Sequence, residues 1–238
     1  MMVETRERLC AALDGSDREW ILETARALGG ASGWLKVGLE AFTAFGPELV
    51  GAVAATGARV FLDLKLHDIP NTVRGAAANC ARSGAAMFNV HASGGRAMME
   101  AAVEGAERGT PPGAPRPRVI AVTVLTSLDR AALEALGIPA DPETLVVRWA
   151  RLAQEAGLDG VVASAREAAA IRSACGPGFL VVTPGIRPRW AASDDQKRIV
   201  TPADAVAAGA DILVVGRPIT RADDPAAAAG RILAEIAG

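Results

Sequence analysis

A short apolar segment followed by an Ala-rich amphipathic segment recurs eight times along this 238-residue chain, and this repeat limits the possible folds. The apolar segments are expected to be β-strands, at Leu9–Leu13, Trp34–Leu39, Arg59–Leu64, Ala86–Val90, Val119–Leu125, Gly160–Ala163, Phe179–Val182 and Ile212–Val215. The expected helices lie near Asp17–Leu28, Ala41–Ala55, Thr72–Ser83, Gly95–Arg108, Pro142–Ala156, Ala165–Ala174, Pro202–Ala208 and Pro225–Ile236.

Strict alternation of strand and helix favours parallel strands joined by right-handed crossovers. Eight such units in a chain of this length predict a closed (β/α)8 TIM barrel, and we expect residues 1–238 to form a single α/β domain. A doubly wound open sheet is the structural alternative. The turn Leu13–Ser16 after the first strand is too short for a glycine-rich dinucleotide-binding loop. The Pro-rich patch Thr110–Pro117 is expected to be a surface connection, because the alternation resumes after it.

Charge and cysteine content exclude several classes of protein. A net charge of −2 and an isoelectric point near 5.8 provide no basic surface for nucleic acid and no polybasic membrane patch. The three cysteines, Cys10, Cys80 and Cys175, are far apart and only two histidines are present, so neither a disulfide framework nor a zinc cluster is expected. The sequence contains no run of about twenty apolar residues. We therefore expect a cytoplasmic protein with reduced thiols.

Three charged residues stand at the end of the third expected strand. Asp63 and Lys65 are two residues apart and should face the same side of the strand, while Asp68 lies just beyond its end. Burying charges without partners is costly, so these groups should neutralise one another around a site. A structural ion pair at the end of a strand is the alternative interpretation.

Other polar residues also fall at the carboxyl ends of the expected strands, which is where the active sites of TIM barrels form. They are Asp14, Lys36, His91, Thr126, Ser127, Arg187 and Arg217. Asp14 and Lys36 could extend the Asp63–Lys65 pair into a network of charges. Taken singly, Lys36 could instead extend its ammonium to solvent, and Asp14 could cap a helix.

The loops after the last two strands have the composition of a phosphate site. Thr183–Arg187 and Val215–Arg217 each combine glycine, which lets backbone N–H groups approach an anion, with an arginine. A phosphorylated ligand is therefore expected. The polar connection from Pro188 to Thr201 has the length of a lid over the site, and a solvated linker is the alternative.

Taken together, these motifs closely resemble those of bacterial orotidine 5′-phosphate decarboxylases. The resemblance runs in order from Asp14 to Pro225, through Asp63-Leu-Lys65-Leu-His-Asp68-Ile-Pro-Asn-Thr72, Val90-His91-Ala, Val122-Thr-Val-Leu-Thr126-Ser127, Thr183-Pro-Gly-Ile-Arg187, Asp195-Gln196 and Val215-Gly216-Arg217. It implies decarboxylation of orotidine 5′-monophosphate to UMP and carbon dioxide, the last step of pyrimidine nucleotide synthesis, without a metal or an organic cofactor.

The resemblance also implies a role for each site residue. Lys65 would be the proton donor, held between Asp63 and Asp68, with Lys36 between Asp14 and Asp63. The implied ligand contacts are those of Asp14 and Lys36 to the ribose, Thr126 and Ser127 near the base, and Gln196, Gly216, Arg217 and Arg187 on the phosphate side. The family is dimeric with shared sites, in which Asp68 and Thr72 reach into the partner's site, and Ile69 is counted with the substrate-binding residues.

Two other functions remain open from the sequence alone. The Asp-x-Lys-x-x-Asp pattern also resembles that of 3-keto-gulonate 6-phosphate decarboxylase and hexulose 6-phosphate synthase, which use a metal-stabilised enediolate. Thr126, Ser127 and the Asp195-Gln196 pair argue against these enzymes. The other possibility is a non-catalytic nucleotide-binding barrel, although such a protein would gain little from an ammonium held against carboxylates.

Overall fold

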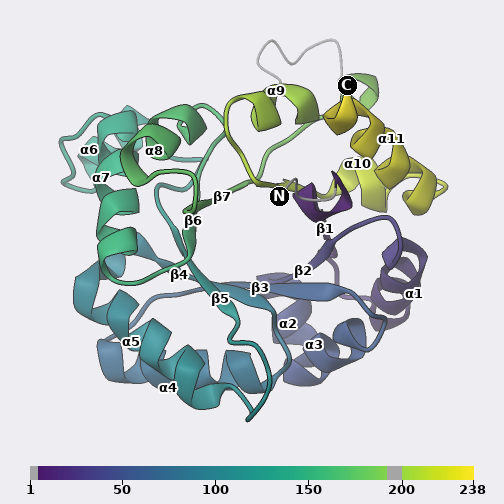
Figure 1. The fold of residues 1–238 in the computed structure, drawn as a ribbon, viewed down its shortest axis with the longest axis horizontal. Coiled ribbons are helices and arrows are strands. Elements are labelled where there is room, and N and C mark those ends of the chain that lie inside the picture. The colour runs from purple at the N-terminus through teal and green to yellow at the C-terminus, as the bar shows by residue number, and fades with distance from the viewer. Residues whose placement is uncertain (1–4, 192–199) are drawn as a thin grey trace.

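A computed structural model describes residues 5–191 and 200–238. Eight parallel strands pair in chain order and close into a barrel, in which β1 pairs with both β2 and β8 (Figure 1). The strands are β1 Leu9–Ala12, β2 Trp34–Gly38, β3 Arg59–Leu66, β4 Met87–His91, β5 Arg118–Val122, β6 Gly160–Val162, β7 Leu180–Thr183 and β8 Ile212–Val215. The predicted TIM barrel is confirmed.

The helices surround the ring of strands (Figure 1). They are α1 Arg18–Leu28, α2 Leu39–Phe45, α3 Pro47–Ala54, α4 Pro70–Arg82, α5 Gly95–Gly109, α6 Arg130–Ala135, α7 Pro142–Glu155, α8 Ala168–Cys175, α9 Pro202–Ala207, α10 Arg217–Thr220 and α11 Pro225–Ala237. Short 3-10 turns occupy Thr5–Arg8, Ala92–Gly94 and Arg189–Ala191. No helix in the described part of the chain is long and apolar enough to span a membrane.

Several predicted boundaries were wrong. The single helix expected over Ala41–Ala55 is divided into α2 and α3, because Gly46 has a φ of 67° and Pro47 disfavours a helical conformation in the residue before it. The fifth strand ends at Val122 instead of Leu125, and the chain then turns along the barrel rim. The third strand runs two residues further than predicted, to Leu66. The short helices α6 and α10 were not predicted.

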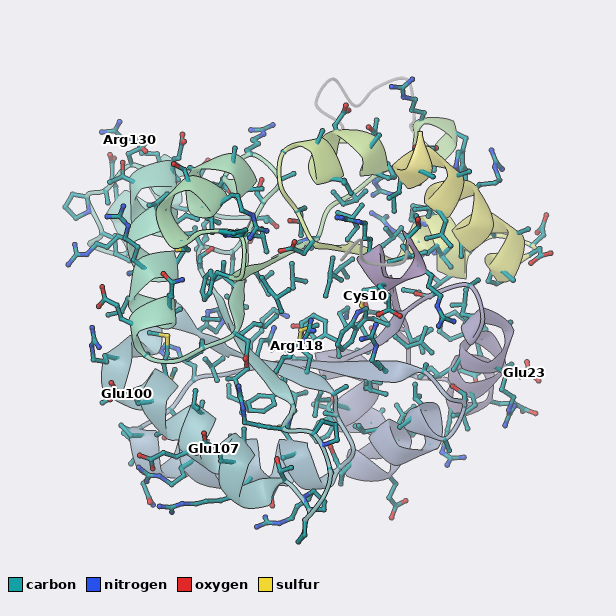
Figure 2. All side chains as sticks on the ribbon, viewed as in Figure 1. Cys10, Glu23, Glu100, Glu107, Arg118 and Arg130 are labelled. Carbon is teal, nitrogen blue, oxygen red and sulfur yellow. The ribbon has the colours of Figure 1, made fainter. Side chains whose placement is uncertain are left out.

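Alternation along each strand divides the core into two layers. On β1, Leu9 and Ala11 pack in the cluster between strands and helices, while Cys10 and Ala12 belong to a separate cluster inside the barrel. Figure 2 shows Cys10 within the ring of strands, whereas Glu23 and Glu100 stand on the outer helices. The same period of two places the functional side chains described below.

Candidate active site

The barrel interior changes from apolar to polar towards the carboxyl ends of the strands. Trp34, Phe61 and Met87 fill the inside of the barrel, and each of these strands carries a polar residue two positions later. These residues are Lys36, Asp63 and Asn89. Because residues two apart on a strand face the same side, the polar side chains form a layer directly above the apolar core.

A cavity of about 490 Å³ opens above this layer. Its polar lining comes from the ends of five strands and from the loops and the helix that follow them: Asp14, Lys36, Glu40, Asp63, Lys65, Thr126 and Gly216. Apolar atoms of Phe61, Val122 and Val214 form its floor. The cavity therefore lies at the end of the barrel where TIM-barrel enzymes carry out their chemistry.

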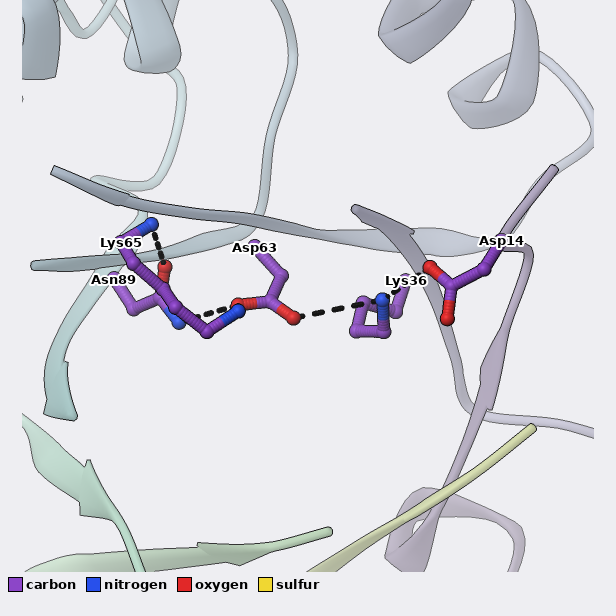
Figure 3. Close-up of polar contacts among 5 residues, drawn as sticks. All are labelled: Asp14, Lys36, Asp63, Lys65 and Asn89. Carbon is purple, nitrogen blue, oxygen red and sulfur yellow. Dashed lines mark hydrogen bonds and ion pairs between the residues drawn. The ribbon is translucent and has the colours of Figure 1, made fainter. Parts of the chain in front are cut away.

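Four of these residues form a row of alternating charges (Figure 3). Lys36 Nζ lies 2.6 Å from Asp14 Oδ1 and 3.5 Å from Asp63 Oδ2. Lys65 Nζ lies 2.6 Å from Asp63 Oδ1. Each carboxylate or ammonium inside the row thus has an opposite charge beside it.

The row keeps its members charged. Burial alone would lower the pKa of the Lys36 ammonium, but Asp63 and Asp14 outweigh burial and raise that pKa above its ordinary value. Burial alone would raise the pKa of the Asp63 carboxyl, yet Lys36, Lys65 and the hydrogen bond from Asn89 lower it. Both groups are therefore ionised at neutral pH.

The choice of lysine in this row is informative in an arginine-rich chain. The sequence contains three lysines, and two of them, Lys36 and Lys65, line this cavity. An ammonium can release a proton at a reacting atom, whereas a guanidinium stays protonated at any working pH. A lysine at the cavity wall is therefore the better proton donor.

Lys65 has an unusual backbone. Its φ of 54° is the only positive value at a non-glycine residue in the described part of the chain. The pairing of β3 with β4 is irregular here, since Leu62 pairs with Phe88 but the next pair is Leu66 with Val90. Neither this bulge nor a role for Asn89 was predicted from the sequence, in which Asn89 is a lone amide within an apolar strand.

The sequence also matches a known family over almost its whole length. The family described as orotidine 5′-phosphate decarboxylase / HUMPS family matches residues 7–232. The chain belongs to this family. A relative named orotidine 5′-phosphate decarboxylase from Anaeromyxobacter sp. (strain K) is 58% identical over 97% of this chain and 98% of its own. One of the same name from Moorella thermoacetica is 53% identical over 98% of this chain and 94% of its own.

Solved structures agree with this membership. The crystal structure of orotidine 5′-phosphate decarboxylase from Lactobacillus acidophilus superposes with a TM-score of 0.87 at 36% identity, covering 97% of this chain and 99% of that one. An uncharacterized conserved protein from Geobacillus kaustophilus superposes with a TM-score of 0.85 at 46% identity, covering 96% of this chain and 99% of that one. The barrel is thus the family's fold.

Of the remaining residues in the family motifs, Ser127 lines a neighbouring cavity, whereas Arg187 and Arg217 line neither cavity. Ser127 lines an adjoining cavity of about 480 Å³, which shares Thr126 and Gly185 with the first. Arg187 is half-buried, and its backbone N–H donates to the Val200 carbonyl. Arg217 is exposed and begins α10 directly after Gly216. Neither arginine lines the two cavities.

The residues that follow β3 are exposed. Asp68 is exposed, and its Oδ1 accepts a hydrogen bond from the Ile69 backbone N–H at 2.7 Å. Asp68 makes no ion pair with the described residues of its own chain, so its pairing with Lys65 stays a prediction. Ile69 is 67% exposed, and Thr72 is exposed in the first turn of α4.

Three further expectations concern residues outside this row. His91 ends β4, and its ring lies 5.5 Å from that of His67. Gln196 and most of the expected lid fall outside the described residues. Within residues 5–191 and 200–238, no group of three or more His, Cys, Asp or Glu side chains is placed to hold a metal ion.

Proposed function

We propose that this chain decarboxylates orotidine 5′-monophosphate to UMP and carbon dioxide, as a single catalytic domain. Family membership and the names of its relatives support the reaction. The observation that carries the proposal is the Lys65 ammonium, held 2.6 Å from Asp63 at the wall of a cavity large enough for a nucleotide. A charged proton donor at that position matches what this reaction requires.

The chemistry places a specific demand on the site. When the bond between C6 and the carboxylate breaks, carbon dioxide leaves and the electron pair stays on C6, in the plane of the ring. The ring π system cannot delocalise that pair, so a fixed cation must stabilise it. Lys65 would meet this demand and then transfer a proton from Nζ to C6, which completes UMP and leaves a neutral amine that regains its proton from water.

Asp63 would hold the ammonium and face the departing group. Its Oδ1 accepts from Lys65, which fixes the direction of the ammonium before the reaction begins. Its negative charge would also lie near the substrate carboxylate, where repulsion favours loss of carbon dioxide. Lys36 balances this charge from the other side, so that Asp63 stays ionised.

The rest of the cavity would bind the parts of the substrate that do not react. Asp14 and Lys36 would hold the ribose hydroxyls, while Thr126 and Ser127 lie beside the base. Gly216, Arg217, Gln196 and Arg187 would bind the phosphate. Binding energy from the phosphate and ribose would then position C6 against Lys65, which is how remote groups contribute to the rate. We propose no metal or organic cofactor for this reaction.

We further propose a cytoplasmic homodimer with shared active sites. Asp68, Ile69 and Thr72 are exposed at the beginning of α4, next to but not within the row of charges. In a symmetric dimer these residues would enter the partner's site, where Asp68 would supply the second carboxylate for Lys65. This arrangement would give a partner to an exposed aspartate that makes no ion pair with the described residues of its own chain.

The test is an assay of the purified protein with orotidine 5′-monophosphate in excess EDTA. We expect the ultraviolet absorbance of the substrate to change and UMP to appear by mass spectrometry. Loss of activity in EDTA that Mg²⁺ restores would favour the metal-dependent enediolate chemistry. Tight binding of UMP without any turnover would favour the nucleotide-binding barrel.

A further inference from the structure

We propose that Asn89 is a positioning residue for this decarboxylation. Its side-chain amide fixes both the carboxylate that holds the Lys65 ammonium and the backbone that carries the Lys65 side chain. The inference rests on the proposed function, because the reaction depends on where the Lys65 Nζ atom stands.

Both halves of the Asn89 amide are used (Figure 3). Nδ2 donates to Asp63 Oδ1 at 2.7 Å, and Oδ1 accepts from the Lys65 backbone N–H at 2.7 Å. Asn89 is 1% exposed, so water does not compete for either hydrogen bond. The amide is therefore committed to these two residues and to nothing else that the described residues provide.

The first hydrogen bond fixes the carboxylate. Asp63 Oδ1 accepts from Asn89 Nδ2 and from Lys65 Nζ at once, while Oδ2 faces Lys36. The Asn89 donor thereby sets the rotation of the carboxylate plane. Without it, Asp63 could turn with its two lysines, and the Lys65 ammonium would follow.

The second hydrogen bond fixes the backbone. Between the pairs Leu62–Phe88 and Leu66–Val90, β3 has three residues where β4 has only Asn89. The regular ladder is interrupted there, and the Lys65 N–H donates to the Asn89 side chain instead of to a strand carbonyl. This contact holds Lys65 at a φ of 54°, a conformation that lysine rarely adopts.

Two substitutions separate a positioning role from a merely structural one. Asn89→Leu keeps the branched shape and removes both hydrogen bonds. Asn89→Asp keeps the acceptor for the Lys65 N–H but places a second carboxylate against Asp63. When that new carboxyl is protonated, its hydroxyl can donate to Asp63, so low pH should restore the arrangement of the wild type.

The pH readout must allow for the other titratable groups around this position. They are Asp14 and Cys10 near β1, Lys36 on β2, Asp63, Lys65 and His67 on and after β3, and His91 on β4. All of them are present in both proteins. They are also present in Asn89→Leu, which adds no carboxyl, so a pH-dependent activity ratio that Asn89→Asp shows and Asn89→Leu lacks comes from the new carboxyl.

The experiment measures single-turnover rates with orotidine 5′-monophosphate, affinity for UMP, and thermal stability. We expect Asn89→Leu to slow turnover by about 100-fold or more, the usual cost of a catalytic group misplaced by about 1 Å. Its affinity for UMP should stay within about threefold of the wild type, because the phosphate and ribose contacts lie elsewhere. For Asn89→Asp, we expect the activity ratio to rise at least about tenfold from pH 8 to pH 5.

Thr123→Val is the matched control. The Thr123 hydroxyl is buried and donates to the Val162 carbonyl at 2.9 Å, outside the row of charges. Its loss should cost stability without slowing turnover by more than about threefold. Turnover by Asn89→Leu within threefold of the wild type would overturn the inference, as would a pH-independent ratio for Asn89→Asp. A wild-type protein without any turnover would instead contradict the proposed function itself.

Discussion

Gly38 lies so close to Asp14 that a β-carbon built on this glycine would stand 2.6 Å from the Asp14 Oδ1 atom. It would also stand 2.7 Å from Lys36 Nζ. Both distances are too short for a real side chain, so with a β-carbon at position 38 the ends of the Asp14 and Lys36 side chains would have to shift from their present ion pair.

Gly38→Ala should therefore separate Asp14 from Lys36 without unfolding the barrel. The backbone at Gly38 has a φ of −93°, which alanine tolerates, so the collision is with side chains alone. We expect kcat/KM to fall at least about tenfold, with thermal stability changed by only a few degrees. Gly30→Ala is the control, because nothing lies within 4 Å of the added carbon. A Gly38→Ala protein as active as Gly30→Ala would contradict this role.

Lys65→Ala should abolish turnover while leaving ligand binding intact. Proton donation and electrostatic stabilisation are both lost, and we expect single-turnover rates to fall by about four orders of magnitude. The affinity for UMP, measured by calorimetry, should change little.

Lys65→Arg separates the two roles of this residue, because arginine keeps the positive charge but cannot release a proton. We expect it to remain nearly as slow as Lys65→Ala. Turnover by either variant within about tenfold of the wild type, a barrier change of roughly 1.4 kcal/mol, would exclude Lys65 as the proton donor.

Because of Asp63, the free energy of unfolding should depend on pH in the acid range. Its folded pKa is lower than its unfolded pKa, so its contribution is present above about pH 4 and is lost as the pH falls through the folded value. Asp63→Asn should destabilise the protein by roughly 2 kcal/mol at pH 7, because two lysines lose a shared partner. Urea unfolding at pH 7, 5 and 3.5 should show that the difference in unfolding free energy between the wild type and Asp63→Asn becomes smaller below pH 4.

Glu134→Gln is the control for the pH series. Glu134 is an exposed residue that pairs with Arg130 one turn away on the surface of α6, so its removal should cost less than about 0.5 kcal/mol. A gap between wild type and Asp63→Asn that widens as the pH falls would contradict the depressed pKa of Asp63.

Much of this site follows from two simple periodicities. Alternating strands and helices predict a barrel, and the period of two along β2 and β3 places Lys36 and Asp63 inside it. Asn89 was missed because a single amide in an apolar strand has no spacing that marks it. The left-handed backbone of Lys65 could not be predicted either, since it depends on a hydrogen bond that the Lys65 N–H donates to a side chain on a different strand. The helix break at Gly46–Pro47, by contrast, could have been predicted from these two residues alone.

Arg217→Ala should lower activity toward the phosphorylated substrate selectively. Arg217 stands beside Gly216, which lines the cavity, and an arginine there can act only on an anion. We expect kcat/KM for orotidine 5′-monophosphate to fall by about 100-fold or more, while turnover of the phosphate-free nucleoside orotidine is almost unchanged. Equal losses for both substrates would show that Arg217 supports the fold or the chemistry instead.

Mixing two inactive variants should restore activity if the sites are shared. Lys65→Ala lacks the proton donor, and Asp68→Asn lacks the exposed carboxylate that makes no ion pair with the described residues of its own chain. If Asp68 acts on the partner's Lys65, each mixed dimer has one site with both defects and one that is wholly wild type. Random exchange at equal amounts should then recover roughly a quarter of wild-type activity.

If Asp68 acts within its own chain, every site keeps a defect. No recovery, in a mixture that native mass spectrometry shows to contain mixed dimers, would therefore exclude the shared site.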